Sequence, residues 1–407
     1  MTLPPAEVSE TDAVTAPGPL DGVVIADFSR VLAGPYCSML LADLGATVIK
    51  VESPAGDETR AYKPPTLGDD STYYLSVNRN KRSIVLDLTN AADRAAAQQL
   101  AQRADVVIQN FKPGGAARFG LDYEAVSKTN PSVVYASISG FGTEPAAAGL
   151  LGYDLLIQAL SGMMDVTGTP DAPPLRAGLS MFDVITGLHS AIGILAALHH
   201  RERAGEGQHV EMSLLMSALS GMVNLTGAYV MTGAVPRRMG NEHPSLYPYA
   251  PFDTRQGQLI LAIGNDHQFR RLCRAVGLPD LADDPRFATA PARSAHRDAL
   301  RPLLTRALLQ RTADEWFEVL ARDSIPAAPI QDVAGGLATA TRLGLQPTVR
   351  SGTGDEALPG IRNPITFSAT PASYRYRPPG IGEHSEEILA WLRAGTDDPH
   401  LTESDQQ

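Results

Sequence analysis

One aspartate, Asp183, stands just before an apolar stretch of the chain, in a position where a carboxylate can do chemistry. The apolar residues that follow it recur three or four positions apart, which predicts a helix with one apolar face. They are Ile185, Leu188, Ile192, Leu195 and Leu198. Aspartate is a favoured N-cap, and its loss from a cap typically costs about 1 kcal/mol. An ionised carboxylate is also a nucleophile toward activated carbonyl groups. The spacing alone favours the cap.

The turn after the first expected strand, within "SRVLAGPYCSML", is a second candidate for chemistry. A strand followed by a helix invites a dinucleotide interpretation, but neither G-x-G-x-x-G nor G-x-x-x-x-G-K-[ST] is found there. Ala33 and Gly34 precede a helix that has Pro35 in its first turn. The free amides and the dipole of such a helix start attract anions. An ordinary strand-to-helix turn has the same spacing, and the spacing alone favours it.

Two further segments of this acidic chain contain basic residues. Arg79, Lys81 and Arg82 stand at the start of an expected strand, where they suit a polyphosphate or form solvated surface. A second group follows the end of another expected strand, where ligands of open α/β sheets usually bind. It comprises Asn110, Phe111, Lys112 and Arg118. Phe111 suits stacking on an adenine or packing in the core, and each of these signals is weak by itself.

The composition argues against several classes of partner. A net charge of −11 disfavours nucleic acid and anionic membranes, since either needs a basic face on the protein. No uninterrupted apolar run reaches the length of about 20 residues that spans a membrane. Cysteine or histidine pairs at metal-ligand spacing are absent, so no metal site is expected. Cys37 and Cys273 stand far apart, which indicates a reducing compartment, the cytoplasm.

The expected elements alternate between strands and helices. Strand-like 23–28 and 47–52 flank a helical segment, 35–45, and predict a βαβ unit. Further strands are expected at 83–88, 105–111 and 132–142, with helices over 91–103 and 123–129 between them. Because these strands are apolar throughout, we expect an α/β fold with a mostly parallel sheet covered on both faces.

A chain of 407 residues exceeds what one hydrophobic core usually serves, so we expect more than one domain. The apolar segment from Val210 to Val230 predicts a helix that connects them. The expected parts are a disordered tail over 1–19, a large domain over 20–200, a linker helix over 201–230, a smaller α/β domain over 231–330, a return linker over 331–384, and a C-terminal helix over 385–407 that returns to the large domain.

Taken together and in this order, the segments resemble the class III CoA-transferases. The resemblance rests on "LDGVVIADFSRVLAGPYCSMLLADLGATVIKVE", "STYYLSVNRNKRSIVLDL", "NFKPG", "GYDLLIQALSG", "FDVITGLHSAIGILAAL", "GEGQ" and "IGEHSEEIL", and it runs from Leu20 to Leu392. The family includes formyl-CoA transferase, carnitine CoA-transferase and succinate hydroxymethylglutarate CoA-transferase, and the last is the most similar. The resemblance to this family implies a Rossmann-like large domain, a small domain on long linkers, and an interlocked homodimer.

The resemblance implies a site for coenzyme A or acyl-CoA as substrate, with no bound prosthetic group. Carried over by position, the implied contacts are Val31, Ala33, Leu86, Asp87, Thr89, Asn110, Phe111, Lys112, Arg118, Tyr153 and Asp154. The family's catalytic aspartate falls on Asp183. Two departures stand out. The glycine-rich loop of formyl-CoA transferase is missing, and a family arginine is replaced by Ser53, so that Arg60 or Lys63 would have to supply its contact.

The implied reaction moves CoA from an acyl-CoA to a free carboxylic acid. The Asp183 carboxylate attacks the thioester and forms an aspartyl anhydride, and the released CoA thiolate then gives an aspartyl-CoA thioester. The acceptor acid repeats these steps in reverse. A position near a helix start is expected to keep this carboxylate ionised.

The resemblance also suggests succinyl-CoA as the donor and a dicarboxylic or hydroxy acid as the acceptor. His243, Tyr247 and Tyr249 are then expected near the acyl group, and Arg237 or Arg238 beside a distal carboxylate. Structural roles in a loop are equally open for these residues.

Three other functions stay open. An acyl-CoA racemase of the same family needs an acid/base group on each face of the α-carbon. Tyr153 stands where the family's racemases carry a histidine, and its unperturbed pKa of about 10 makes it a poor base. A non-catalytic CoA-binding protein would be favoured if Asp183 were replaced, and it is not. A nicotinamide oxidoreductase is disfavoured by the missing glycine fingerprint.

Overall fold

The computed structural model describes residues 17–147 and 149–394, which form two compact units. The first unit comprises the described residues up to Ser161, Ala177–Met231, and the described residues from Gly344 onward. The second unit comprises Gly162–Arg176 and Thr232–Leu343. Most of the expected tail over 1–19, and the end of the expected C-terminal helix, lie outside the described residues.

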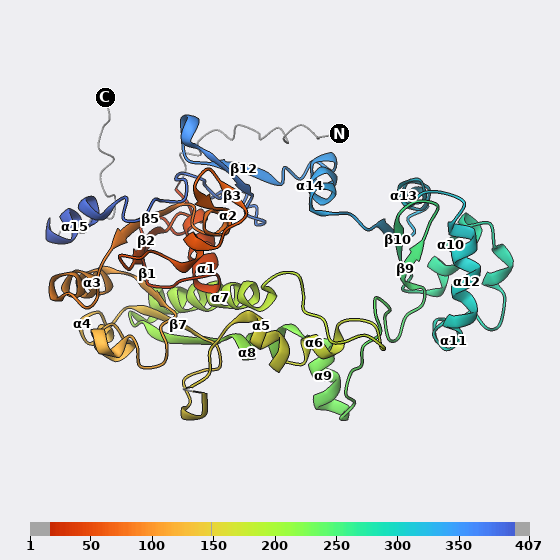
Figure 1. Ribbon diagram of the computed structural model, residues 1–407, viewed down its shortest axis with the longest axis horizontal. Coiled ribbons are helices and arrows are strands. Elements are labelled where there is room, and N and C mark those ends of the chain that lie inside the picture. The colour runs from red at the N-terminus through yellow and green to blue at the C-terminus, as the bar shows by residue number, and fades with distance from the viewer. Residues whose placement is uncertain (1–16, 148, 395–407) are drawn as a thin grey trace. The chain divides into compact units, whose positions relative to one another are not determined.

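Six strands form the sheet of the first unit, in the order β5-β2-β1-β6-β7-β8, and every pair of neighbours is parallel (Figure 1). Ala26 on β1 lies opposite Ile49 on β2 and Val107 on β6, and all three side chains are fully buried. The predicted α/β fold with a mostly parallel sheet is confirmed. The strands are β1 (Val24–Asp27), β2 (Thr47–Glu52), β5 (Lys81–Val85), β6 (Val106–Gln109), β7 (Val134–Ser139) and β8 (Gln208–Ser213).

Helices cover both faces of this sheet. On one face a hydrophobic core joins the strands to three helices, and it includes Leu100, Val126 and Trp391. These helices are α3 (Ala91–Arg103), α4 (Tyr123–Thr129) and α15 (Ser385–Ala394). On the other face α7 (Met181–Ala204) packs against α1 (Ala33–Asp43), β7 and β8. The first unit also contains α2 (Thr72–Ser76), α5 (Asp154–Leu160), α8 (Leu214–Gly221) and α9 (Val223–Thr232), the last of which ends at the unit's edge.

The predicted helix from Val210 to Val230 is wrong at its start. Residues Gln208–Ser213 are β8, which pairs with β7 at the edge of the sheet. Gly207 allows this pairing, because a Cβ there would lie 2.0 Å from the Val133 carbonyl oxygen. The strand is short and partly exposed, so its residues show no clear alternation between apolar and polar. Its apolar residues were therefore assigned to the helix that follows. Ser213 then caps α8 by accepting the Met216 N–H.

The second unit has a three-stranded antiparallel sheet in the order β11-β10-β9, packed against helices. Its core includes Phe252, Leu259, Phe269 and Trp316, all less than one-tenth exposed. The strands are β9 (Tyr249–Asp253), β10 (Gln258–Ala262) and β11 (Ala327–Pro329). The helices are α6 (Met163–Val166), α10 (Asp266–Ala275), α11 (Ala290–Ala295), α12 (Arg297–Leu308), α13 (Ala313–Arg322) and α14 (Val333–Arg342).

Residues 331–384, predicted as a linker, contain regular structure. They include α14 and an antiparallel hairpin of β12 (Thr348–Ser351) and β13 (Leu358–Ile361). Pro and Gly residues in this stretch obscured the short periodic segments between them. The chain then reaches α15, whose Trp391 ring lies 3.9 Å from the Arg103 guanidinium on α3.

One described helix, α7, is long and apolar enough by composition to cross a membrane, and α8 with α9 passes the same test only as a bent pair. Core helices of other proteins share this length and composition. Since α7 packs against α1 and two strands, one face of the helix, which includes Phe182, Ile194 and Leu198, is buried within the fold.

Candidate active site

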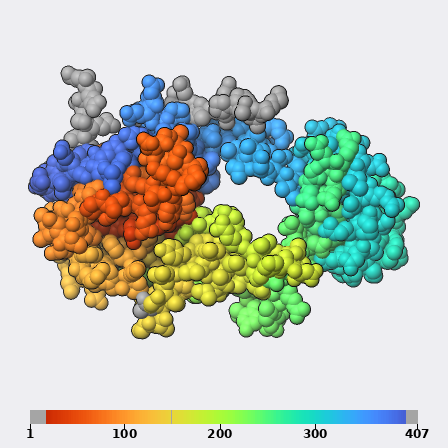
Figure 2. Space-filling view, viewed as in Figure 1, coloured from red at the N-terminus to blue at the C-terminus, as the bar shows by residue number. Residues whose placement is uncertain are grey.

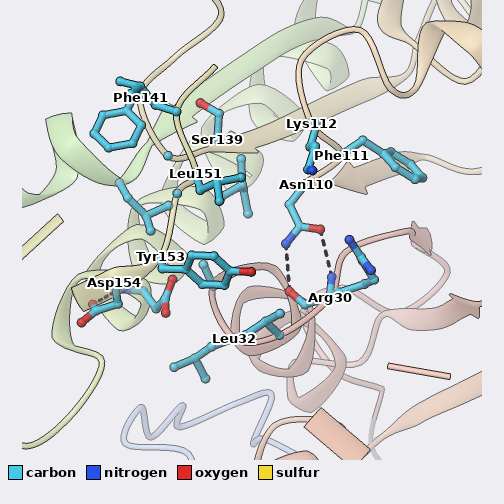
Figure 3. Close-up of a pocket in the computed structure, with 18 of the residues that line it drawn as sticks. Arg30, Leu32, Asn110, Phe111, Lys112, Ser139, Phe141, Leu151, Tyr153 and Asp154 are labelled. Atoms are coloured by element: carbon cyan, nitrogen blue, oxygen red, sulfur yellow. Dashed lines mark hydrogen bonds between the residues drawn. The ribbon is translucent and has the colours of Figure 1, made fainter. Parts of the chain in front are cut away.

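A pocket of the first unit opens at the carboxyl ends of β1, β6 and β7 (Figure 3). From β1 the chain continues toward β2 on one side of the sheet, and from β6 it continues toward β7 on the other side. A reversal of this kind separates the loops that follow the two strands and leaves a crevice between them. Residues 30–33, 110–113 and 139–142 line this crevice.

Reciprocal hydrogen bonds join the loops after β1 and β6. The backbone N–H of Arg30 donates to Asn110 Oδ1 over 3.0 Å, and Asn110 Nδ2 donates to the Arg30 carbonyl over 2.8 Å (Figure 3). The Arg30 guanidinium pairs with Glu58 at the rim of the pocket. The two loops therefore hold one another across the crevice.

Eight of the predicted site residues line this one pocket: Val31, Ala33, Asn110, Phe111, Lys112, Tyr153, Asp154 and Asp183. Lys112 and Tyr153 are exposed at the pocket, and Asp154 is buried. The Phe111 ring also packs between Phe28 and Phe119, at centroid distances of 6.5 and 6.3 Å, so the core role predicted for it is present.

The structure does not bring the other four predicted CoA contacts to this pocket. Leu86 is 2% exposed within the hydrophobic core. Asp87 accepts the Thr89 N–H and hydroxyl in a local turn. Arg118 is exposed, with its guanidinium 5.7 Å from the Phe119 ring.

The basic cluster after β2 is neither a polyphosphate site nor solvated surface. Arg79 pairs with Asp43 at 2.6 Å in the interior, and Lys81 is fully buried beside Asp27. Burial lowers the pKa of Lys81 to about 8, although the Asp27 carboxylate opposes the shift. Arg82 is partly buried and pairs with Glu387 on α15.

Arg60 cannot readily replace the family arginine at Ser53. Its guanidinium donates twice to Glu52, each time over 2.8 Å, and it lies 3.7 Å from the Tyr74 ring centre. Lys63 is exposed and donates to the Asp69 carbonyl.

The predicted role of Asp183 as a cap is wrong, because another carboxylate caps its helix. Asp183 is the third residue of α7, and the N-cap residue Ser180 makes no side-chain cap hydrogen bond. Instead Asp154 Oδ1 accepts the backbone N–H groups of Phe182 and Asp183 at 2.7 and 3.1 Å. The Asp183 carboxylate is therefore not needed for capping, and Asp183 lines the pocket.

Gln158 on α5 supports the site from behind Asp154, and the sequence pattern did not single it out. Its side chain is buried and donates to Asp154 Oδ2 over 2.5 Å and to the Leu179 carbonyl over 3.2 Å. Its Oε1 accepts the Ala177 N–H over 2.9 Å. Asp154 and Gln158 thus fix both the start of α7 and the segment that leads into it.

Burial raises the pKa of Asp183 to about 7, and the neighbouring Asp154 carboxylate raises it further. The expectation that the helix start keeps Asp183 ionised is therefore wrong in direction. Removal from water and a like charge outweigh the helix dipole here. Near neutral pH the carboxyl group is divided between its protonated and ionised forms. The ionised form is more basic, and so a stronger nucleophile, than an ordinary aspartate.

Tyr73 on α2 is a second residue that the sequence pattern did not single out. Burial raises the pKa of its hydroxyl, the Asp183 carboxylate raises it further, and a hydrogen bond with Ser180 opposes the shift. Its ring packs edge-on against Tyr62 at 5.5 Å. Only its place within "STYYLSVNRNK" pointed to this part of the chain.

The three residues predicted near the acyl group lie in the second unit and stay predictions. Tyr247 is 1% exposed in the core of that unit, and burial raises its pKa to about 12. The His243 ring lies 5.2 Å from the Tyr249 ring, and its Nδ1 accepts the Ser245 N–H. Of the two predicted arginines, Arg238 pairs with Asp165 at 2.9 Å, and Arg237 is exposed.

Comparison with known proteins identifies the family of this chain. Residues 20–385 match the family model described as CoA-transferase family III. The chain is 42% identical to a succinate–glutarate CoA-transferase of Agrobacterium fabrum, over 94% of this chain and 98% of that protein. It is 40% identical to a succinyl-CoA:mesaconate CoA-transferase of Haloarcula hispanica, over 93% of this chain and 98% of the relative.

A crystal structure shows the same similarity in three dimensions. The CAIB/BAIF family protein from Brucella suis superimposes with a TM-score of 0.84 at 40% identity, over 93% of this chain and 100% of that one. The chain therefore belongs to CoA-transferase family III, as the sequence segments predicted. It is an enzyme, a CoA-transferase whose substrates are CoA thioesters and carboxylic acids.

Proposed function

We propose that this CoA-transferase moves CoA from succinyl-CoA to a dicarboxylic acid and that Asp183 is its nucleophile. The observation that carries the proposal is a pocket that brings Asp183 together with the loops after β1 and β6. The names of two relatives support the proposed substrates. The first name pairs succinate with glutarate, and the second pairs succinyl-CoA with mesaconate.

In the first half-reaction, an ionised Asp183 oxygen attacks the thioester carbonyl carbon of the donor. The C–S bond breaks, CoA leaves as a thiolate, and a mixed aspartyl anhydride is formed. The thiolate then attacks the Asp183 carbonyl carbon, which releases the donor acid as a carboxylate and leaves an aspartyl-CoA thioester. One acyl bond forms and one breaks at each step, so no external energy source is consumed.

In the second half-reaction the acceptor carboxylate attacks the aspartyl-CoA carbonyl and expels the CoA thiolate. The thiolate attacks the acyl carbonyl of the new anhydride, so the acceptor leaves as its CoA thioester and Asp183 returns as a carboxylate. Each step passes through a tetrahedral oxyanion, which nearby N–H groups would stabilise.

Two features of the pocket suit the anionic groups of CoA. Helix α1 begins at Ala33, and its N-cap residue Leu32 offers no side-chain acceptor. Amides in the first turn of an uncapped helix, together with the dipole, favour a nearby negative charge. Lys112 adds an exposed cation on the facing loop.

A screen of acceptor acids tests the proposed substrates. The purified enzyme is incubated with succinyl-CoA and glutarate, mesaconate, other dicarboxylic acids or matched monocarboxylic acids, and new acyl-CoAs are measured by mass spectrometry. We expect dicarboxylic acids to react fastest. Equal rates with monocarboxylic acids of the same length would contradict the proposed acceptor class.

Incubating a 2-methylacyl-CoA in deuterated water tests the racemase alternative, which requires exchange of the α-proton.

We also propose a homodimer in the cytoplasm. Helices α5, α7 and α8 pack against one another in the first unit, in the part of the chain coloured yellow to green in Figure 2. They leave apolar side chains exposed. These side chains are Leu155, Leu156, Leu160, Leu188, Ile192, Leu195 and Met216. An exposed apolar surface of this kind is typical of a subunit interface.

Cys37 and Cys273 are both buried and unpaired, which supports a reducing compartment.

A further inference from the structure

Val31 has a backbone conformation that is rare for its residue type. Its φ of 70° lies in the left-handed region, which residues branched at Cβ seldom adopt. Such a conformation costs of the order of 1–3 kcal/mol and persists only where the surroundings impose it. Val31 lines the pocket that contains Asp183, so this strain lies in the wall of the site.

A buried ion pair holds the peptide groups on both sides of Arg30. Lys50 Nζ on β2 donates to the Ser29 carbonyl over 3.2 Å and to Asp57 Oδ2 over 2.8 Å. Asp57 Oδ1 accepts the Val31 N–H over 3.4 Å. The side chains of Lys50 and Asp57 are both fully buried. The pair therefore connects the carbonyl before Arg30 to the amide after it.

The stability of the fold does not by itself explain this pair. Removing two charges from water costs several kcal/mol per ion, and an apolar pair of similar volume is often at least as stable. Asp57 has local partners as well, since it accepts the N–H and hydroxyl of Thr59. What the ion pair adds is a fixed geometry for residues 29–31, against the preference of the Val31 backbone.

We propose that Lys50 and Asp57 are positioning residues that hold Val31 in its left-handed conformation and so fix the wall of the pocket for acyl-CoA. The inference rests on the proposed acyl-CoA pocket. Neither side chain lines the pocket, so both act through the backbone of residues 29–31.

A double-mutant cycle of Lys50→Met and Val31→Gly tests the inference. Glycine adopts a positive φ without strain, so the loop no longer needs the ion pair in that background. We expect Lys50→Met to raise the KM for acyl-CoA by about tenfold in the wild-type background and by less than about threefold in the Val31→Gly background. Equal increases in the two backgrounds would overturn the inference.

A matched control separates positioning from general loss of stability. Arg79→Met removes the cation of another buried pair, with Asp43, which does not touch residues 29–31. We expect the control to lower the melting temperature as Lys50→Met does, with an unchanged KM for acyl-CoA. An equal rise in KM in both variants would overturn the inference.

Two further measurements keep the inference testable if Lys50→Met does not fold or if the proposed function is wrong. Asp57→Ala removes the acceptor of the Val31 N–H and the partner of Lys50, so it should also raise the KM for acyl-CoA. A wild-type KM in this variant would count against the inference. Hydrogen exchange of a peptide spanning residues 29–33 reports loop order without turnover. We expect faster exchange in Lys50→Met than in Arg79→Met, and equal exchange would contradict the inference. Should Asp183→Asn remain active, the proposed function would fail whatever the exchange shows.

Discussion

The Asp154 carboxylate caps the helix that carries Asp183, because its Oδ1 accepts the backbone N–H groups of Phe182 and Asp183 at 2.7 and 3.1 Å. The cap places a second negative charge next to the proposed nucleophile. The same side chain therefore fixes the start of α7 and raises the pKa of the Asp183 carboxyl, in addition to the larger effect of burial.

The variant Asp154→Asn separates these two roles. The amide oxygen still accepts the two N–H groups, but the negative charge is gone. We expect the pKa of Asp183 to fall toward its ordinary value, so the pH dependence of kcat/KM moves to lower pH. A folded variant whose pH dependence matches the wild type would show that Asp154 does not influence the acidity of Asp183.

The wild-type enzyme should gain activity as the pH rises through the pKa of Asp183. Burial raises this pKa to about 7, and only the ionised carboxylate attacks a thioester. We expect kcat/KM for acyl-CoA to fall about tenfold for each pH unit below the pKa and to level off above it. Steady-state rates from about pH 5.5 to about pH 8.5 measure this, and a flat profile would argue against an ionising nucleophile.

The free energy of unfolding should show the same titration. The pKa of Asp183 in the folded chain, about 7, lies above the ordinary value of 3.8, so the folded state binds the proton more tightly. The stability that this group contributes is thus present below about pH 4 and is lost as the pH rises to about 7. Asp183→Asn should stabilise the protein by roughly 1–3 kcal/mol at about pH 8 and leave it unchanged at about pH 4.

Denaturant unfolding at both pH values measures this difference, with the exposed Asp323→Asn as a control that should change little at either pH. A destabilised Asp183→Asn variant at the higher pH would mean that the buried charge carries no penalty.

A charge on the exposed apolar surface should disrupt the proposed dimer. Ile192 on α7 is 64% exposed in the described chain, and Ile192→Glu would place a carboxylate in the interface. We expect the wild type to remain a dimer on dilution to nanomolar concentration in light scattering, and the variant to dissociate or precipitate. The control is Leu309→Glu, an exposed apolar residue of the second unit, which should stay dimeric. A monomeric wild type would contradict the proposal.

Local periodicity was enough to predict most of the sheet that positions the site. The helices over 91–103 and 123–129 have the predicted bounds, and the first βαβ unit differs by only a few residues. These elements have strong apolar patterns bounded by turn residues. The edge strand β8 was missed because its six residues are partly exposed and do not alternate clearly between apolar and polar. The helix that follows has a stronger apolar pattern, and the prediction extended that helix over the strand.

Pairings distant in sequence could not be predicted from spacing. Asp154 caps a helix that begins 27 residues later in the chain, so the aspartate adjacent to the helix was assigned the cap instead. Lys81 and Arg79 were expected in solvent or on a phosphate because their buried partners, Asp27 and Asp43, come from other elements. The resemblance to the family brought Asp183 forward as the nucleophile, which the helix pattern alone did not.

The central claim is that Asp183 becomes covalently acylated during turnover. Wild-type enzyme and Asp183→Asn are each incubated with succinyl-CoA and then with hydroxylamine, and the peptide containing residue 183 is weighed by mass spectrometry. The account predicts a hydroxamate on Asp183 in the wild type only, with kcat lower by several orders of magnitude in the variant, which should still fold and bind CoA. An unmodified wild-type peptide under turnover, or an Asp183→Asn variant that transfers CoA at a near wild-type rate, would contradict it.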